Sequence, residues 1–251
     1  MKKLMITMVL VYLSSNASAK SNKIASIPEA SGICYASTSD TLFVVHDEGR
    51  IYEITLQGKI LRKVVVGKYD FEGIACDNKN SLLYVAVEKD EAIFTLSMQT
   101  LKIIKKSYIN RTYNGKMLLK KDKKRGFEGI TFDKDFFYVA NQSKKPYPKK
   151  DSSVIVKVKR NLKNRMKIID VIDPKHPDIS GLTIYHKKLY MLSDTKDRIY
   201  IYHLKKEKLK KKSYKLPKFA QEGIAFDEKG NIYIADDEGA IFKYKVKDIF
   251  R

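Results

Sequence analysis

Residues 126–132 read GFEGITF, and the Glu-Gly-Ile at its centre occurs again in DFEGIACD at 70–77 and QEGIAFD at 221–227. Two related segments carry serine in place of glutamate, ASGICY at 30–35 and ISGLTIY at 179–185. The central glycines, which are Gly32, Gly73, Gly129, Gly181 and Gly223, are spaced by 41, 56, 52 and 42 residues. Repetition at such periods is typical of arrays and propellers.

The first four repeats each contain four short segments in which apolar residues alternate with polar ones. In the third repeat these segments are GITFD, FFYVANQ, VIVKVK and MKIIDVI. Such alternation indicates strands, and four antiparallel strands per repeat is the pattern of a propeller blade. The sequence therefore predicts an all-β fold, a five-bladed β-propeller of four-stranded antiparallel blades.

The last repeat lacks its fourth segment, because only KDIFR follows AIFKYKV. A spare strand-like segment, NKIASIP at 22–28, precedes the first repeat. Pairing an N-terminal strand with the last blade removes an open sheet edge. We expect residues 23–27 to lie beside the third strand of the fifth blade and to close the ring.

The first 19 residues, MKKLMITMVLVYLSSNASA, have two lysines, a short apolar run and small residues at Ala17 and Ala19. This arrangement is typical of a secretory signal peptide cleaved after Ala19. Residues 20–251 then form a single propeller domain, periplasmic or secreted, with no transmembrane segment. The formal net charge is +21, and removal of the two leader lysines leaves +19.

The run EASGICYASTSDTLFVVHDEGRIYEITLQGKIL at 29–61, followed by DFEGIACD, resembles the SdiA-regulated family. The resemblance extends over the whole mature chain. It implies an exported bacterial propeller, distantly similar to NHL-repeat propellers, with five blades and a bound calcium ion. The lysine-rich insertions depart from the family pattern, so a shared surface partner does not follow from the resemblance.

Two sets of oxygen-bearing residues are expected at one mouth of the ring, where first strands begin and second strands end. The first set precedes the repeated glycines: Ser31, Glu72, Glu128, Ser180 and Glu222. The second follows the second strands: Asp47, Glu88, Gln142, Asp194 and Asp237. Glu29, Asp70 and Asp178 lie two residues ahead of the first set. Converging carboxylates repel one another unless a cation lies among them.

Calcium is the predicted cofactor, because it accepts six to eight oxygen ligands in flexible geometry. The proposed ligands are Glu72, Glu128, Glu222, Asp47, Glu88, Asp194 and Asp237. Magnesium fits less well because it requires a tighter octahedron. The alternative is that these acids cap turns or pair with lysines. We expect that role for Asp77, Asp133 and Asp227, at the opposite face. Glycine in Glu-Gly would allow close backbone approach beside the axis.

Cys34 and Cys76 lie on the innermost strands of neighbouring blades, at positions whose side chains point to opposite faces of the sheet. They either face each other between the blades or face apart, and we expect two buried free thiols. An oxidising compartment would also allow a disulfide.

His46 is the only histidine in register with the predicted mouth. It is a weak catalytic candidate, because a calcium-dependent hydrolase needs a base near the ion. The alternative is a hydrogen-bonded turn histidine. Two functions therefore remain open. One is an exported calcium-binding protein that binds or scaffolds at the cell envelope, with an unknown ligand at the mouth. The other is a calcium-dependent hydrolase of esters, lactones or phosphoesters.

Lysine runs at 120–125, 143–150 and 205–212 fall in linkers or outer hairpins. Such clusters favour solubility or attraction to anionic partners. An anionic envelope polymer or lipid surface is the expected partner class. Nucleic acid is disfavoured because the chain is expected to be exported.

Overall fold

The computed structural model describes residues 22–119, 126–149, 152–160 and 164–251, so the expected signal peptide lies outside the described residues. Five antiparallel sheets form the blades. Blade 1 comprises β2 (Ala30–Ala36), β3 (Thr41–His46), β4 (Arg50–Thr55) and β5 (Ile60–Val65). Blade 2 comprises β6 (Phe71–Asp77), β7 (Leu82–Val87), β8 (Ala92–Ser97) and β9 (Ile103–Ile109). Blade 3 comprises β12 (Phe127–Asp133), β13 (Phe136–Asn141), β14 (Val154–Lys159) and β16 (Ile168–Ile172).

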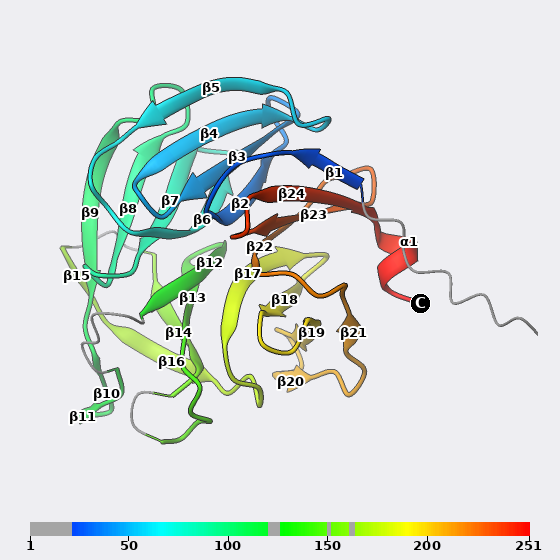
Figure 1. Cartoon of the computed structure of the whole chain (residues 1–251). Helices are drawn as coiled ribbons and strands as arrows, with labels where there is room; N and C mark the ends of the chain where they lie inside the picture. Colours follow the sequence, from blue (N-terminus) through cyan, green and yellow to red (C-terminus); the bar gives the residue numbers. More distant parts are fainter. Residues whose placement is uncertain (1–21, 120–125, 150–151, 161–163) are drawn as a thin grey trace, which may run out of the picture.

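Blade 4 comprises β17 (Ile179–Tyr185), β18 (Lys188–Ser193), β19 (Arg198–His203), β20 (Lys208–Leu209) and β21 (Tyr214–Lys215). Blade 5 comprises β22 (Gln221–Phe226), β23 (Asn231–Asp236), β24 (Ala240–Lys245) and β1 (Asn22–Ala25). The innermost strands surround one axis (Figure 1). The predicted five-bladed propeller is confirmed. The expected fourth strand of blade 4 is split, because β20 and β21 pair separately with β19 on either side of a lysine-rich segment.

The N-terminal strand closes the ring as expected. β1 pairs antiparallel with β24, with Lys23 opposite Phe242 and Ala25 opposite Ile241. Figure 1 shows β1 running beside β24, although the two segments lie at opposite ends of the chain. Ile27, just after β1, is fully buried in the apolar layer between blades 5 and 1. The first and last segments of the described chain therefore complete one blade.

Minor elements extend the blades outward. β15 (Arg165–Met166) pairs parallel with the outer strand β9, and β10 (Thr112–Tyr113) and β11 (Lys116–Met117) form a small hairpin. The chain ends in a one-turn helix, α1 (Val246–Ile249), where the fifth repeat lacks its fourth segment. Among the described residues, no helix is long and apolar enough to cross a membrane.

The core consists of five apolar clusters, each between two neighbouring blades. In the first, Phe43 of β3 and Val45 lie with Phe71 and Phe94 of blade 2. Alternate side chains of a strand point to opposite sheet faces, so each blade contributes to two clusters. A blade that is apolar on both faces cannot be stable alone, which explains why the repeats assemble around an axis.

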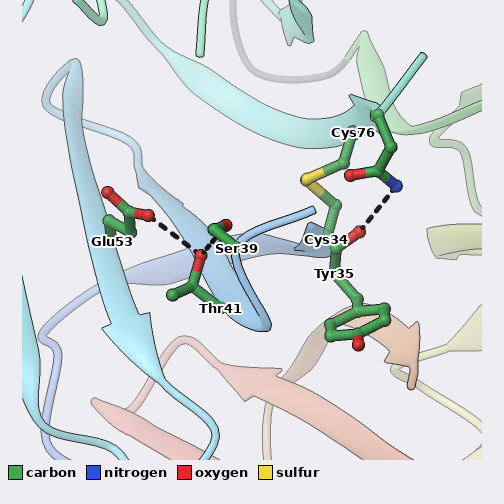
Figure 2. Close-up of a disulfide and its surroundings, with 7 residues drawn as sticks. Cys34, Tyr35, Ser39, Thr41, Glu53 and Cys76 are labelled. Carbon is green, nitrogen blue, oxygen red and sulfur yellow. Dashed lines mark hydrogen bonds between the residues drawn. A yellow bond between two sulfur atoms is a disulfide. The ribbon is translucent and has the colours of Figure 1, made fainter. Parts of the chain in front are cut away.

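Cys34 and Cys76 form a disulfide that joins β2 of blade 1 to β6 of blade 2 (Figure 2). Their Cα atoms are 5.6 Å apart. The expectation of two free thiols was therefore wrong. Alternation along a strand tells which face of the blade a cysteine is on, but blade 1 and blade 2 present opposite faces to the same interface. Residues on opposite faces of successive blades therefore meet.

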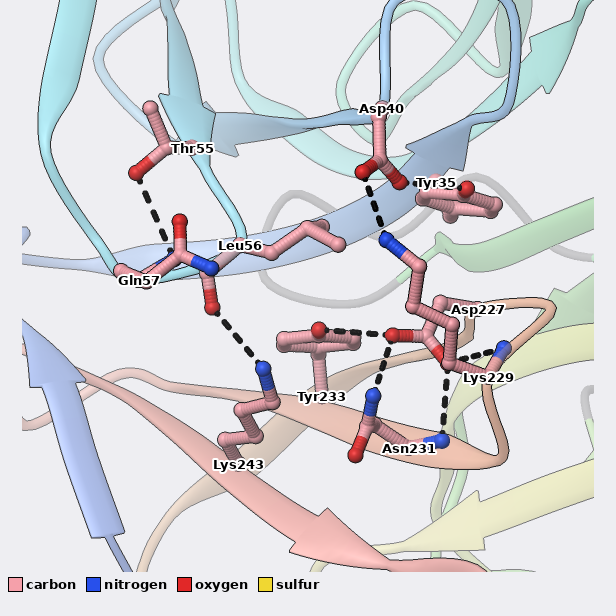
Figure 3. A network of polar contacts seen from close by, with 10 residues as sticks. All are labelled: Tyr35, Asp40, Thr55, Leu56, Gln57, Asp227, Lys229, Asn231, Tyr233 and Lys243. Atoms are coloured by element: carbon pink, nitrogen blue, oxygen red, sulfur yellow. Dashed lines mark hydrogen bonds and ion pairs between the residues drawn. The ribbon is translucent and has the colours of Figure 1, made fainter.

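The face opposite the predicted mouth is held by aspartates that cap turns, as expected for Asp77 and Asp227. Asp227 accepts hydrogen bonds from the backbone amides of Lys229 and Asn231 and from the Tyr233 hydroxyl, at 2.8–2.9 Å (Figure 3). Lys229 also forms an ion pair with Asp40 of blade 1, at 2.8 Å. These contacts tie the last blade to the first.

The Asp77 carboxylate plays the same part between blades 2 and 3. It accepts hydrogen bonds from the Asn80 backbone amide at 3.1 Å and from the Tyr84 hydroxyl at 2.9 Å. Arg160, which follows β14, donates to it at 2.5 Å. Burial alone would raise the pKa of Asp77, but these hydrogen bonds outweigh burial and lower it. Asp133, the third aspartate of this group, is exposed at the end of β12.

Candidate metal centre

Each innermost strand departs from regular pairing at the residue before the repeated glycine. The register shifts between Ala30 and Gly32, Phe71 and Gly73, Phe127 and Ile130, Ile179 and Gly181, and Gln221 and Gly223. A β-bulge leaves a residue out of the ladder and redirects its side chain. The bulges contain the whole first set: Ser31, Glu72, Glu128, Ser180 and Glu222. The Glu-Gly repeat is thus the sequence of a bulge beside the axis.

The repeated glycines are needed because the innermost strands touch. A Cβ added to Gly32 would lie 2.6 Å from the Glu72 carbonyl oxygen, and one on Gly73 would lie 2.3 Å from the Glu128 carbonyl oxygen. A Cβ added to Gly129, Gly181 or Gly223 would likewise lie 2.6–2.7 Å from a backbone atom of the next blade. The space enclosed by this ring is only about 10 Å³. The expected close backbone approach is confirmed, and the axis is pinched into two separate mouths.

Backbone hydrogen bonds bring the second set towards the first in three blades. The amide of Glu88 donates to the Asp70 carbonyl at 3.0 Å. The amides of Gln142 and Asp237 donate to the carbonyls of Gly126 and Ala220 at 2.9 Å. In every case the acceptor lies two residues before the bulge position. The end of the second strand is therefore held beside the start of the first.

The carboxylates gather most closely in blade 2. Asp70, Glu72 and Glu88 each place one carboxylate oxygen within 4.8 Å of the others. Burial raises the pKa of Glu72 well above its ordinary value, and the charges of Glu88 and Asp70 raise it further. Burial raises the pKa of Glu88 to about 7, with Asp70 adding to the effect. Three acids at this spacing resist full ionisation without a cation.

Glu128 and Glu222 extend this cluster around the axis. Glu128 is 6% exposed, and its pKa is raised well above the usual range by burial and then by Glu72 and Glu222. Burial likewise raises the pKa of Glu222, followed by the charges of Asp194 and Glu72. The three glutamates of the repeat thus interact electrostatically across the mouth. We define Asp70, Glu72, Glu88, Glu128 and Glu222 as the axial cluster.

Cationic partners are scarce at the axial cluster. In the described part of the chain, the one ion pair that reaches it joins Lys89 Nζ to Asp70 Oδ2 at 2.8 Å, and the Lys89 side chain is 66% exposed. Glu222 Oε2 is buried, and no residue that the structure describes forms a hydrogen bond with it. The carboxyls of Glu88 and Glu128 interact directly, and this interaction opposes the rise in the pKa of Glu88 that burial causes. The deep carboxyls therefore lack the positive charge that buried carboxylates require.

The remaining predicted ligands lie towards the rim of the same mouth. Burial and then Glu29 raise the pKa of Asp47 to about 7. Burial and then Asp178 raise the pKa of Asp194. Asp237 is exposed. Asp70, which the sequence placed beside the ring and not among the ligands, belongs to the cluster itself, because its carboxylate lies within 4.8 Å of those of Glu72 and Glu88.

A second acidic cluster on the same face already has a positively charged side chain beside it, that of Arg50. Glu29, His46 and Glu48 also place their ligand atoms within 4.8 Å of one another. Arg50 Nη1 lies 2.5 Å from Glu48 Oε2 and 3.0 Å from His46 Nε2. The guanidinium thus supplies the positive charge that this cluster needs, whereas the axial cluster has a lysine only at its edge.

His46 is held as a turn residue. Its Nδ1 accepts the backbone amide of Glu48 at 3.0 Å, and its Nε2 faces Arg50. Burial, followed by the charge of Arg50, lowers its pKa. The Nδ1 lone pair is therefore occupied within the turn after β3, as in the alternative considered from the sequence.

The fold and this mouth define a five-bladed β-propeller with a carboxylate-rich axial face. Residues 12–245 match the SdiA-regulated family, and the chain belongs to that family. No match is found among curated proteins.

Solved structures with a similar fold include three proteins of different kinds. A glutaminyl cyclase of Myxococcus xanthus is 12% identical, with a TM-score of 0.62 over 90% of this chain and 94% of that one. A chain of a nidogen/laminin complex is 15% identical, with a TM-score of 0.53 over 82% and 72%. The β-propeller domain of Cps50 (Swd1) from Myceliophteria thermophila is 10% identical, with a TM-score of 0.52 over 90% and 100%. At these identities the likeness extends to the fold alone.

Proposed function

We propose that the axial cluster binds a divalent cation, calcium foremost, and that the propeller acts as a binding or scaffolding protein of the cell envelope. The observation that supports the site is the set of buried carboxyls around Glu128 for which the described residues supply no cationic partner. Their donor atoms are all oxygen, which suits a hard cation and not a soft one. Calcium tolerates the irregular arrangement of such ligands better than magnesium. A bound ion would supply the charge that lets the glutamates ionise together.

Two features support a role outside the cytoplasm. The N-terminal 19 residues have the composition of a signal peptide. The Cys34–Cys76 disulfide fits an oxidising compartment, where such bonds persist. The net charge of +21 and the lysine runs favour an anionic envelope polymer or lipid surface as partner.

The binding role is favoured over calcium-dependent hydrolysis by the placement of His46. A hydrolase needs a base with a free lone pair near the bound water. The Glu48 amide occupies the Nδ1 lone pair of His46, and Arg50 lies against Nε2. The geometry thus supplies ligands for an ion without assigning a base.

Calorimetry of chelator-treated protein with calcium tests the site. We expect binding and a higher melting temperature, since an ion that binds only the folded form stabilises it. Glu128→Gln keeps the shape but removes a charge, and should weaken both effects. Asp133→Asn, on the opposite face, is the matched control and should leave both unchanged. Absence of heat at millimolar calcium, with the wild type and Glu128→Gln melting alike, would reject the site.

A further inference from the structure

A cleft of about 690 Å³ opens on the acidic face beside the axial cluster, between blade 1 and blade 2. Acidic and basic side chains line it together: Glu29, Asp47, Glu48 and Asp70, and Arg50, Lys68 and Lys89. Its volume is in the range of small-molecule sites. Asp70 belongs both to this cleft and to the axial cluster, so the two sites share a carboxylate.

The walls of the cleft are preformed by contacts between two glycine-containing segments. The Val66 amide donates to the Gly49 carbonyl at 2.9 Å. A Cβ on Gly67 would lie 2.6 Å from the ring of Tyr69, so that ring packs on the backbone. Lys106 Nζ donates to the Tyr69 hydroxyl at 2.9 Å, and the ring meets Phe94 edge-on at 5.0 Å between centroids. Tyr69 is therefore a fixed aromatic wall.

The basic side chains of the cleft differ in whether an acidic side chain neutralises their charge. Arg50 pairs with Glu48, at 2.5 Å. Lys68 is exposed, and no ion pair involves it in the described residues. Lys89 pairs with Asp70, the carboxylate for which a cation in the axial cluster would compete. A cation that takes Asp70 would release Lys89, because two positive charges at one carboxylate repel each other.

We propose that the cleft binds a small organic anion, bearing a carboxylate or a phosphate group, only when the axial cluster holds a divalent cation. This inference rests on the proposed function. Four carboxylates outnumber three basic side chains in the cleft, so its formal charge is −1 without an ion, and a divalent ion bound by Asp70 offsets that carboxylate. Lys68 and the released Lys89 bind the anionic group, and Tyr69 and the exposed Val65 contact an adjacent apolar group.

The test is titration calorimetry with phenyl phosphate and with benzoate, each with and without calcium. Benzyl alcohol, which has the ring without the charge, is the control ligand. We expect binding of one or both anions with calcium and none in chelator, and the preferred probe identifies the anionic group. Lys68→Met should weaken anion binding by about tenfold, the scale of one charged hydrogen bond.

Lys89→Met separates this inference from simple charge loss. It should tighten calcium binding, because the side chain that competes for Asp70 is gone. It should also weaken anion binding by about tenfold. Lys59→Met, in the exposed turn between β4 and β5, should change neither affinity. If calcium binds but the anions bind equally in chelator, or not at all, this inference fails and the cation site stands. If calcium itself does not bind, both fail.

Discussion

A Cβ on Gly73 would lie 2.3 Å from the carbonyl oxygen of Glu128, in the next blade. The glycine of one Glu-Gly pair thus makes room for the backbone of the following one. Every blade repeats the contact, and the last blade makes it with the first. The glycine of the motif allows the innermost strands to approach and close the ring, and the glutamate places a carboxyl at the mouth.

Gly73→Ala should therefore destabilise the ring. The added methyl group meets the backbone of β12 at Glu128, Gly129 and Ile130, so the innermost strands must separate, at a cost of about 2–3 kcal/mol. Urea unfolding measures the loss. Gly115→Ala is the control, since it has φ +73° but open space around it, and backbone strain alone costs about 1 kcal/mol. Equal losses in the two variants would contradict the close-approach explanation.

Closure by the N-terminal strand predicts that Ile27→Ala is costly. The side chain is fully buried between blades 5 and 1, and truncation of such a residue costs about 3 kcal/mol. For a domain of this size that loss lowers the melting temperature by roughly 6–12 °C. Deleting residues 20–28 should lower it further. Ile60→Ala, at a position 47% exposed, should change it little. A deletion variant that melts like the wild type would refute this closure.

The carboxyls of the acidic mouth predict an unusual pH dependence. Burial raises the pKa of Glu88 and of Asp47 to about 7, above that of an unfolded carboxyl. The ion-free folded form therefore binds more protons than the unfolded chain between about pH 4 and 7, and its stability falls as the pH rises through that window. We expect a lower ion-free melting temperature at about pH 8 than at about pH 5.5.

Calcium should reverse this trend, because the ion replaces the protons. Its effect on the melting temperature should be larger at about pH 8 than at about pH 5.5, and smaller in Glu128→Gln at both. Thermal melts in chelator and in calcium provide the comparison. An ion-free protein that becomes steadily more stable across this range would argue against a buried carboxyl cluster.

The disulfide predicts sensitivity to reductant. Cys34 and Cys76 are 42 residues apart, and cross-linking over such a loop contributes about 4 kcal/mol by the chain-entropy argument. Reductant should lower the unfolding midpoint of the wild type. The double variant Cys34→Ala with Cys76→Ala should start lower and not respond. A wild-type midpoint that reductant leaves unchanged would count against a stabilising cross-link.

The lysine-rich surface predicts salt-sensitive association with anionic vesicles. Screening shortens with ionic strength, so retention should fade as salt is added. Replacing the exposed Lys205, Lys206 and Lys208 with glutamine should reduce retention at low salt. Uncharged vesicles provide the control. Retention that is as strong at high salt as at low salt would indicate an interaction that is not electrostatic.

The amino-acid sequence by itself determined the blades, their number and the closing strand. Strand alternation and repeat spacing are local properties, and five repeats that are apolar on both faces have to surround an axis. The same register brought Glu72, Glu128 and Glu222 to one mouth, because equivalent positions of equivalent blades lie at equivalent heights.

The tertiary structure alone decided what depends on contacts between blades and turns. Cys34 and Cys76 meet because neighbouring blades present opposite faces to one interface. Arg50 lies against His46 Nε2 while the Glu48 amide donates to Nδ1, which no spacing in the sequence reveals. The cleft beside Asp70 likewise arises from the packing of Gly49 on Gly67. Repetition sets the position of a residue within its blade, but through-space packing sets its partner.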